Sequence, residues 1–335
     1  MAPNFPPPPP ANPEDIKLDL YPILRIFKDG KIERFFGTAT VPAGTDPATG
    51  VQSKDVIIAP EDGVGARLYL PNNSSPEKKL PVLIYYHGGG FCAESAWSPS
   101  YHTYLNLLAA EANVVVVSVN YRLAPEHPLP AAFEDSWTAF KWVASHSERD
   151  GCDPWLNEYV DFNKVFLSGD SAGGNIVHHM AVRAGEERES LPGIKLDGVI
   201  LLHPFFSGVE LIGNEPDLAE ALVVMEKLWK LVHPGMSDLD DPFINPFKDL
   251  EKAKKVGCKR VLVCVATKDA LACRGVEYGE VMKRCGKEGL KMEVFKSEEM
   301  EHVFHLVDPN REESKKLMKK VVQFINGCQS HQVSE

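Results

Sequence analysis

A serine flanked by very small residues, GDSAG (169–173), lies between an apolar run and a segment with helical periodicity. The spacing matches G-x-S-x-G, in which a serine on a tight strand-to-helix turn has a strained backbone and needs small neighbours. Such a turn exposes the hydroxyl, and the N-terminus of the following helix offers N–H groups to a developing anion. We therefore predict that Ser171 is a nucleophile. A phosphate-binding loop is the alternative, but the patterns G-K-[ST] and G-x-G-x-x-G are missing here.

A glycine-rich turn, HGGGF (87–91), follows the apolar run LPVLIYY (80–86). Because glycines let backbone amides approach a ligand closely, this turn can stabilise an acyl oxyanion or a phosphate. Together with Ser171 it matches the H-G-G-G form of oxyanion loop. The predicted oxyanion donors are the amides of Gly88, Gly89, Gly90 and Ala172, although the sequence does not decide which glycine amides point inward. For His87 we expect a structural role in anchoring the loop.

Ser171 needs a base, because a neutral hydroxyl is a poor nucleophile, and the base needs a carboxylate that fixes its tautomer. In parallel sheets such residues lie on loops after the carboxyl ends of later strands. Asp269 follows the apolar run KRVLVCVAT, and His302 follows the next run, KMEVFKS. The chain order serine, aspartate, histidine is the one expected of a hydrolase on this kind of sheet. We therefore predict a triad of Ser171, Asp269 and His302.

Other carboxylates and histidines are alternatives for the acid and the base. Three aspartates in an irregular stretch compete for the acid: Asp240, Asp241 and Asp249. Three further histidines compete for the base: His178, His179 and His305. The first two fall on the helical segment after the nucleophile, where surface or core-edge positions are expected. The third lies three residues beyond the predicted base, and we expect it to serve packing.

The elements that must position these residues alternate along the chain. Apolar runs of the kind found in strands buried on both faces cover residues 80–86, 113–121, 164–169, 196–205, 259–267 and 291–297. Amphipathic stretches between them predict helices at 98–112, 131–149, 172–188, 271–289 and 310–327. This order predicts an α/β fold with one mostly parallel sheet and helices on both faces.

Two regions depart from this alternation. Before residue 80, the segments ERFFGTATV, KDVIIAP and GARLYLP alternate weakly between turn residues and predict antiparallel edge strands of the same sheet. Residues 206–250 mix apolar helix-like pieces with turn signals, so we expect an insertion, or cap, over one end of the sheet, joined by residues 14–30. We expect a single domain over 1–335, with a disordered proline-rich tail at 1–13.

Composition narrows the classes of partner. The 335 residues carry a net charge of −11 without a Lys/Arg block, which disfavours nucleic acid and anionic membrane surfaces. The N-terminus lacks the features of a secretory signal, and no apolar run reaches the roughly 18 residues of a membrane span. Seven cysteines without a C-x-x-C pair are typical of free thiols in a reducing compartment, so we predict a cytoplasmic protein.

The remaining patterns concern cofactors and assembly. The spacings of histidine, cysteine and carboxylate residues offer no ligand set, so neither a metal nor an organic cofactor is expected. The sequence also has no heptad run or apolar stripe for a partner chain, and a monomer is expected.

Four motifs in order resemble the plant carboxylesterase family, within the hormone-sensitive-lipase-like group of α/β-hydrolases. They are HGGGF, NYRLAPEHPLPAAFEDSW (120–137), GDSAGGN and EHVFHL, and the resemblance covers about residues 15–327. It implies an α/β-hydrolase fold with an eight-stranded, mostly parallel sheet and a cap built from N-terminal and inserted helices. By position, it makes Ser171, Asp269 and His302 the triad and assigns the oxyanion donors to the glycine loop and Ala172. The segment at 120–137 then braces the active-site loops.

The resemblance implies a serine carboxylesterase that acts on small-molecule esters, with short acyl groups favoured because plant relatives often prefer them. Two alternatives come from the same family: gibberellin receptors keep the serine but lack the triad histidine, and hydroxyisoflavanone dehydratases use the same pocket for elimination. His302 argues against a pure receptor, since binding needs no base, whereas a dehydratase stays open. Glu301 replaces the glycine of many relatives and puts a second carboxylate beside His302.

Overall fold

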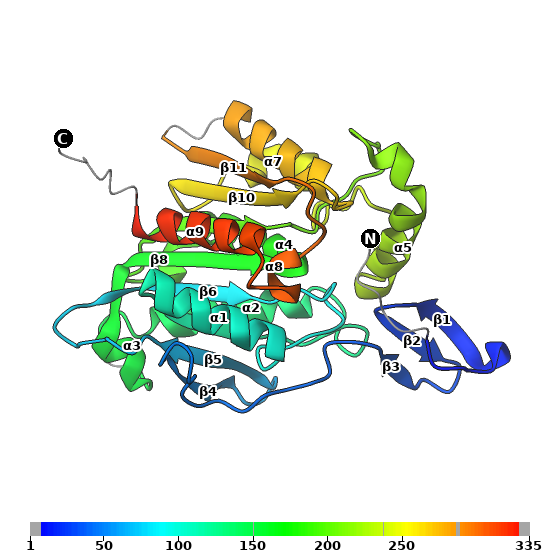
Figure 1. Ribbon diagram of the computed structural model, residues 1–335. Helices are drawn as coiled ribbons and strands as arrows, with labels where there is room; N and C mark the ends of the chain where they lie inside the picture. Colours follow the sequence, from blue (N-terminus) through cyan, green and yellow to red (C-terminus); the bar gives the residue numbers. More distant parts are fainter. Residues whose placement is uncertain (1–7, 150, 237, 286–288, 328–335) are drawn as a thin grey trace.

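The main sheet of the computed structural model, which describes residues 8–149, 151–236, 238–285 and 289–327, has eight strands in the order β11-β10-β9-β8-β6-β7-β5-β4 (Figure 1). These strands are β4 (Gln52–Ala59), β5 (Val64–Leu70), β6 (Leu80–Tyr86), β7 (Val115–Asn120), β8 (Val160–Asp170), β9 (Leu196–Leu202), β10 (Arg260–Ala266) and β11 (Lys291–Ser297). β5 runs antiparallel to both of its neighbours, β4 and β7, and all other pairs are parallel. The predicted α/β-hydrolase sheet is thus confirmed.

Helices cover both faces of this sheet. One face carries α1 (Pro99–Ala112), α8 (Phe304–Val307) and α9 (Glu312–Asn326). The other face carries α2 (Ala131–Ala144), α4 (Ala172–Glu186) and α7 (Ala272–Cys285), while the short α3 (Pro154–Tyr159) precedes β8. In Figure 1, α1 and α9 lie side by side in front of the sheet.

Side-chain alternation explains why the strands are continuous apolar runs. In β6, Val82, Ile84 and Tyr86 enter the core beneath α2 and α4, whereas Leu83 and Tyr85 enter the core beneath α1 and α9. Successive side chains of a strand point to opposite faces, so a strand between two helical layers must be apolar at nearly every position. The carboxyl ends of the parallel strands therefore share one edge of the sheet, where polar loop residues can gather.

The insertion between β9 and β10 forms a cap that includes α5 (Ala219–Val232) and α6 (Leu250–Ala253). α5 packs against the first strand of a second sheet, made of β1 (Ile16–Leu20), β2 (Leu24–Phe27) and β3 (Ile32–Arg34). Figure 1 shows α5 and this small sheet together, to one side of the main sheet. The expected N-terminal cap helices are therefore wrong, because the segment IKLDL alternates with a period of two and forms a strand. The expected edge strand in ERFFGTATV is also wrong, since its first residues end β3 of the small sheet.

Buried polar contacts tie these added parts to the main domain. Arg274 of α7 and Glu215 of the cap form an ion pair with side chains only 4% and 1% exposed, and Nε lies 2.7 Å from Oε1. The same guanidinium donates to the Glu210 carbonyl. Arg34 at the end of β3 donates to the Cys92 carbonyl, just beyond the glycine-rich turn. The cap is thus fastened to α7, and the small sheet to the loop that follows HGGGF.

Part of the predicted proline-rich tail, residues 1–7, lies outside the described residues. Within the described part, the Pro9 carbonyl accepts a hydrogen bond from Arg25 Nη1 at 3.0 Å, so this portion of the tail contacts β2. No helix among the described residues is long and apolar enough to cross a lipid bilayer. Cysteines with free thiols among the described residues include Cys92, Cys152, Cys264 and Cys273.

Candidate active site

Ser171 lies on the turn between β8 and α4 with an unusual positive φ, at φ 53° and ψ −118°. Its N–H donates to the Leu202 carbonyl at 2.9 Å, which fixes the turn against the end of β9. The small neighbours are enforced by packing, because a Cβ on Gly173 would lie 1.9 Å from the Tyr86 carbonyl oxygen. A Cβ on Gly169 would lie 2.5 Å from the Gly173 carbonyl oxygen. The geometry is that of the strained strand-to-helix turn expected from the sequence.

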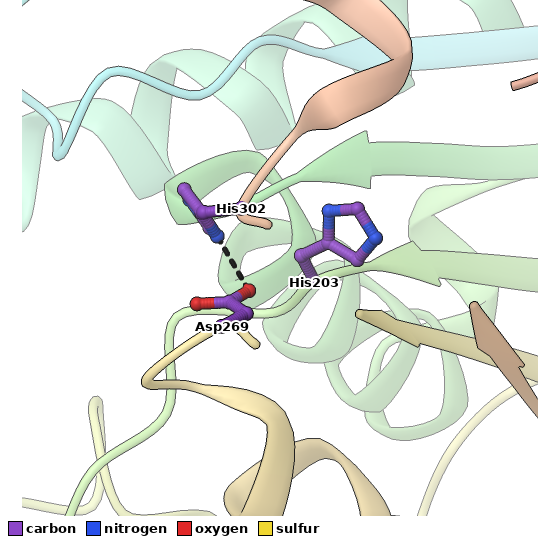
Figure 2. A group of neighbouring side chains, drawn as sticks. All are labelled: His203, Asp269 and His302. Carbon is purple, nitrogen blue, oxygen red and sulfur yellow. Dashed lines mark hydrogen bonds and ion pairs between the residues drawn. The ribbon is translucent and has the colours of Figure 1, made fainter. Parts of the chain in front are cut away.

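Asp269 and His302 come together at the same edge of the sheet, from the loops after β10 and β11. His302 Nδ1 lies 2.6 Å from Asp269 Oδ2, as Figure 2 shows. Since an ionised carboxylate only accepts hydrogen bonds, Nδ1–H is the donor, and Nε2 keeps its lone pair. Leu271 N–H donates to the other carboxylate oxygen at 3.0 Å and holds the acid in place. The two residues thus lie in contact, as expected from their positions after neighbouring strands.

Each residue of this pair stabilises the charged form of the other. Burial alone would lower the pKa of His302, but the Asp269 carboxylate outweighs burial and holds that pKa above the usual range of histidine. Burial alone would raise the pKa of Asp269, yet the charge and hydrogen bond of His302 hold it below the usual value. The side chain of His302 is 35% exposed and that of Asp269 is 3% exposed. The pair therefore consists of a buried anion and an imidazole that solvent or substrate can reach.

The end of β9 links the serine turn to this pair. Leu202 accepts the Ser171 N–H, and the next residue, His203, has its ring centroid 5.9 Å from that of His302. The ends of four neighbouring strands, β8 to β11, therefore bring the three predicted triad residues to one region. This convergence follows from the parallel topology.

The glycine-rich turn differs in part from the prediction. Gly88 N–H donates to Tyr101 Oη at 2.7 Å, so this amide is already bonded inside the protein and does not serve as the predicted oxyanion donor. Gly89 and Gly90 have left-handed φ values of 93° and 61°. A Cβ on Gly89 would lie 2.1 Å from the Ala93 carbonyl oxygen, so the loop needs glycine there. The amides of Gly89, Gly90 and Ala172 stay predicted donors.

Comparison with known proteins gives the family. A model of the alpha/beta hydrolase fold matches residues 83–306. Tuliposide A-converting enzyme 1, chloroplastic, of Tulipa gesneriana is 46% identical over 97% of this chain and 82% of that protein. Probable carboxylesterase 2 of Arabidopsis thaliana is 43% identical over 93% of this chain and 97% of that protein. The chain belongs to the plant carboxylesterase family of α/β-hydrolases.

Two further proteins are similar to this chain. A 2-hydroxyisoflavanone dehydratase of Glycyrrhiza echinata is 42% identical over 93% of this chain and 97% of that protein. A hyperthermophilic esterase from the archaeon Pyrobaculum calidifontis is similar in structure, with a TM-score of 0.67 and 28% identity over 82% of each chain. The protein is thus a carboxylesterase-type α/β-hydrolase, a carboxylic ester hydrolase by class, as the four motifs predicted.

A buried carboxylate lies behind the serine of this carboxylesterase-type hydrolase. Asp170 accepts hydrogen bonds from Tyr85 Oη at 2.8 Å and from Tyr101 Oη at 2.9 Å. Burial raises the pKa of Asp170 to about 6, although both tyrosine hydroxyls favour the charged form. Tyr101 therefore bridges Asp170 and the Gly88 amide. Sequence reasoning missed this network, since its tyrosines belong to β6 and α1.

His87 packs as a structural residue, in agreement with the prediction. Its ring stacks on Tyr121 with centroids 4.2 Å apart, and burial lowers its pKa to about 4. Tyr121 Oη donates to the His87 carbonyl at 2.6 Å, and Arg122 Nη2 lies 2.6 Å from Asp135 Oδ1. The segment 120–137 thus contacts the glycine-rich loop directly, as the resemblance implied.

The rival residues have other partners. In the cap, Asp240 pairs with Lys248, Asp241 pairs with His233, and Asp249 accepts the Lys252 N–H at the start of α6. His178 bonds to Tyr278 Oη, His179 bonds to the Phe243 carbonyl, and His305 packs edge-on against Tyr104. Burial lowers the pKa of the His305 imidazole to about 3, which suits packing.

His203 is the site residue that sequence reasoning missed. One ligand-type atom each of His203, Asp269 and His302 lies within 4.8 Å of the others, which is close enough for a metal ion (Figure 2). His203 Nδ1 accepts the Val303 N–H at 3.0 Å, and His302 Nδ1 lies 2.6 Å from Asp269 Oδ2, so the Nδ1 atoms of both rings already have protein partners. His203 is thus connected to the Asp269–His302 pair through the backbone of Val303. The available signal was the position of His203 at the end of the run LDGVILLH, on the same sheet edge.

Proposed function

We propose that this protein is a serine carboxylesterase that hydrolyses small-molecule esters with Ser171 as nucleophile, His302 as base and Asp269 as the orienting acid. The observation that carries the proposal is the 2.6 Å contact between His302 Nδ1 and Asp269 Oδ2 at the sheet edge that also bears the strained serine turn. The family membership adds support.

The proposed reaction follows from the tautomer of the base. His302 Nε2 takes the proton of Ser171 Oγ, and the oxygen attacks the ester carbonyl. The amides of Gly89, Gly90 and Ala172 donate to the oxyanion, while Asp269 stabilises the imidazolium. The imidazolium then gives its proton to the leaving alcohol, which leaves an acyl group on Ser171. Water, deprotonated by His302, releases the carboxylic acid and restores the hydroxyl.

A short acyl group is the proposed preference, and the cap supports it. A Cβ on Gly90 would lie 2.9 Å from Leu228 Cδ2, so α5 of the cap lies directly on the oxyanion loop. Phe91, one residue further, packs edge-on against Trp229 of the same helix. A helix this close to the predicted donors limits the room beside a bound ester. Substitution of Leu228 by alanine should therefore move the preference toward longer acyl chains, and an unaltered profile would count against this role of the cap.

The test of the function is the initial rate of hydrolysis of p-nitrophenyl esters from acetyl to dodecanoyl, for the wild type and Ser171→Ala. Serine-dependent turnover with a maximum at short chains is expected, with a loss of several orders of magnitude in the variant because the triad acts as a unit. The melting temperature of Ser171→Ala should equal that of the wild type, which would show that the variant is folded. A variant that kept most of the activity would exclude Ser171 as the nucleophile.

A second candidate function is the elimination of water from a hydroxyisoflavanone. The 42% identity to a 2-hydroxyisoflavanone dehydratase favours testing it, because such a reaction uses the same base and oxyanion donors without acyl transfer. Incubation with 2-hydroxyisoflavanone, followed by mass spectrometry for loss of water, separates the two activities. A hormone-like receptor is disfavoured by the Asp269–His302 pair, since binding alone needs no base.

The compartment and assembly are further proposals. The free thiols support the cytoplasm, although the tulip relative is named as chloroplastic. A monomer is proposed as the working state.

A further inference from the structure

An imidazole without a role in the proposed mechanism lies beside the acid–base pair. His203 directly follows β9, is 1% exposed and has a left-handed φ of 45°. Figure 2 shows its ring next to Asp269 and His302. Such a conformation is uncommon for a residue other than glycine, and it persists only where the surroundings impose it. The His203 N–H donates to the Cys264 carbonyl of β10 at 2.8 Å, which fixes the backbone that carries the ring.

The ring holds the backbone of the residue that follows the base. Val303 N–H donates to His203 Nδ1 at 3.0 Å. Val303 has a left-handed φ of 47°, which a β-branched residue rarely adopts. Since His302 is its immediate neighbour, the direction of the His302 side chain depends on this strained turn. The hydrogen bond to His203 is therefore placed to stabilise the conformation that presents the base.

The imidazole of His203 is fixed as a neutral acceptor. Burial, together with the nearby His305 and His302, holds the pKa of His203 well below the usual range. With Nδ1 accepting, the single proton resides on Nε2, which has no hydrogen-bond partner within the described part of the chain. The ring therefore acts on the loop of His302 as an acceptor, through the bond from Val303 N–H to Nδ1.

Other ties to the same loop come from the residues that follow β10 and lead to Asp269. Glu299 N–H donates to Thr267 Oγ1 at 2.8 Å, and Lys268 N–H donates to the Met300 carbonyl at 2.8 Å. Both lie on the N-terminal side of His302. The bond to His203 lies on the C-terminal side, so its loss loosens the loop at that end of the base while the other end stays attached.

We propose that His203 is a positioning residue, whose Nδ1 holds the Val303 amide and thereby sets the geometry of His302 toward Asp269 and the serine. The inference rests on the proposed function. The groups that face His302 are Asp269, Asp170, His203 and His305. Among them Asp269 raises the pKa of His302 most, so a loosened loop weakens this pair and lowers that pKa.

The experiment compares His203→Leu with His203→Asn in hydrolysis of p-nitrophenyl acetate over a range of pH. The leucine removes the acceptor, whereas the asparagine Oδ1 lies where Nδ1 was and can still accept the Val303 N–H. For His203→Leu we expect kcat to fall about 10- to 100-fold with KM within about twofold, because small misplacements of a base have effects of this size. The acid limb of kcat/KM should also move to lower pH. His203→Asn should recover most of the rate and the wild-type limb.

A matched control separates positioning from general packing. His178 is another buried imidazole that is bonded through Nδ1, to Tyr278 Oη at 3.0 Å, away from the acid–base pair. His178→Leu should lower the melting temperature while it leaves kcat and the acid limb unchanged. If His203→Leu behaves like this control, the inference is wrong, whereas an inactive wild type would instead refute the proposed function.

A comparison of His203→Asn with a third variant, His203→Gln, covers the case in which His203→Leu does not fold. His203→Gln carries the same amide one methylene further out, so its oxygen cannot occupy the place of Nδ1. We expect it to be slower than His203→Asn by about tenfold. Equal rates for these two variants would overturn the inference.

Discussion

Replacing Asp269 by asparagine should reverse the position of the proton on His302 while the fold stays intact. In the wild type, the carboxylate accepts the Nδ1–H at 2.6 Å, and Nε2 is left free to take a proton. An asparagine can turn its NH₂ group toward Nδ1, so that Nδ1 becomes the acceptor and the proton moves to Nε2. The base is then blocked at the nitrogen that the proposed mechanism needs.

The size of the effect comes from two contributions. The wrong tautomer of a triad histidine lowers kcat by about 10⁴-fold, or roughly 5.5 kcal/mol of transition-state stabilisation. The pKa of His302 should fall as well, because the carboxylate that raises it is lost. Since the base works deprotonated, activity in the wild type should appear only as the pH rises above the usual histidine pKa of about 6.5. In the variant this acid limb should lie at lower pH.

The assay is kcat for p-nitrophenyl acetate from pH 5 to 9, with the melting temperature of each protein measured in parallel. The cap supplies a matched control, because His233 Nδ1 lies 2.6 Å from Asp241 Oδ2 in a pair with similar geometry. Asp241→Asn should change kcat less than tenfold, though it can cost stability. A decrease in kcat of less than tenfold for Asp269→Asn would refute the assignment of Asp269 as the acid. A decrease of more than tenfold for Asp241→Asn would refute it as well.

Two further predictions concern the serine turn and its buried carboxylate. Gly173→Ala should destabilise the protein by about 2 kcal/mol or more, because its Cβ would lie 1.9 Å from the Tyr86 carbonyl oxygen. The control Gly235→Ala, where the added Cβ meets open space, should leave the stability unchanged. Equal melting temperatures of the two variants would contradict this prediction. Burial raises the pKa of Asp170 to about 6, against about 4 in the unfolded chain, so this group binds more protons in the folded state and its own contribution to stability falls as the pH rises from 4 to 6. Asp170→Asn should remove this contribution. Urea titrations should therefore show that the difference in unfolding free energy between wild type and variant changes by up to about 3 kcal/mol from pH 4 to 6. A difference that stays constant with pH would argue against a raised pKa of Asp170.

The main sheet and the pairing of Asp269 with His302 were predictable because local patterns suffice for both. The run LPVLIYY is buried along nearly its whole length and forms β6 as expected. Asp269 and His302 each follow a strongly apolar strand, and neighbouring parallel strands deliver their loops to the same edge.

The rest depended on partners far away in the chain. The Gly88 amide is taken by Tyr101, thirteen residues later on α1, and no feature of HGGG indicates this. His203 gains its role from Val303, one hundred residues later. The short strands β1 to β3 become regular only by pairing with each other and packing on α5, so a cap of helices was the wrong expectation.

The buried Arg274–Glu215 pair limits how new specificities can be engineered by exchanging caps. A chimera that received residues 206–250 from a relative without an acid at position 215 would leave the buried Arg274 guanidinium with Glu277, 3.5 Å from its Nη1, in place of the closer pair with Glu215, at a cost of up to about 3–5 kcal/mol. Arg274 lies in the first turn of α7, only five residues beyond Asp269. The unit that can be transplanted is therefore larger than the cap itself, and it ends within the helix that follows the acid loop.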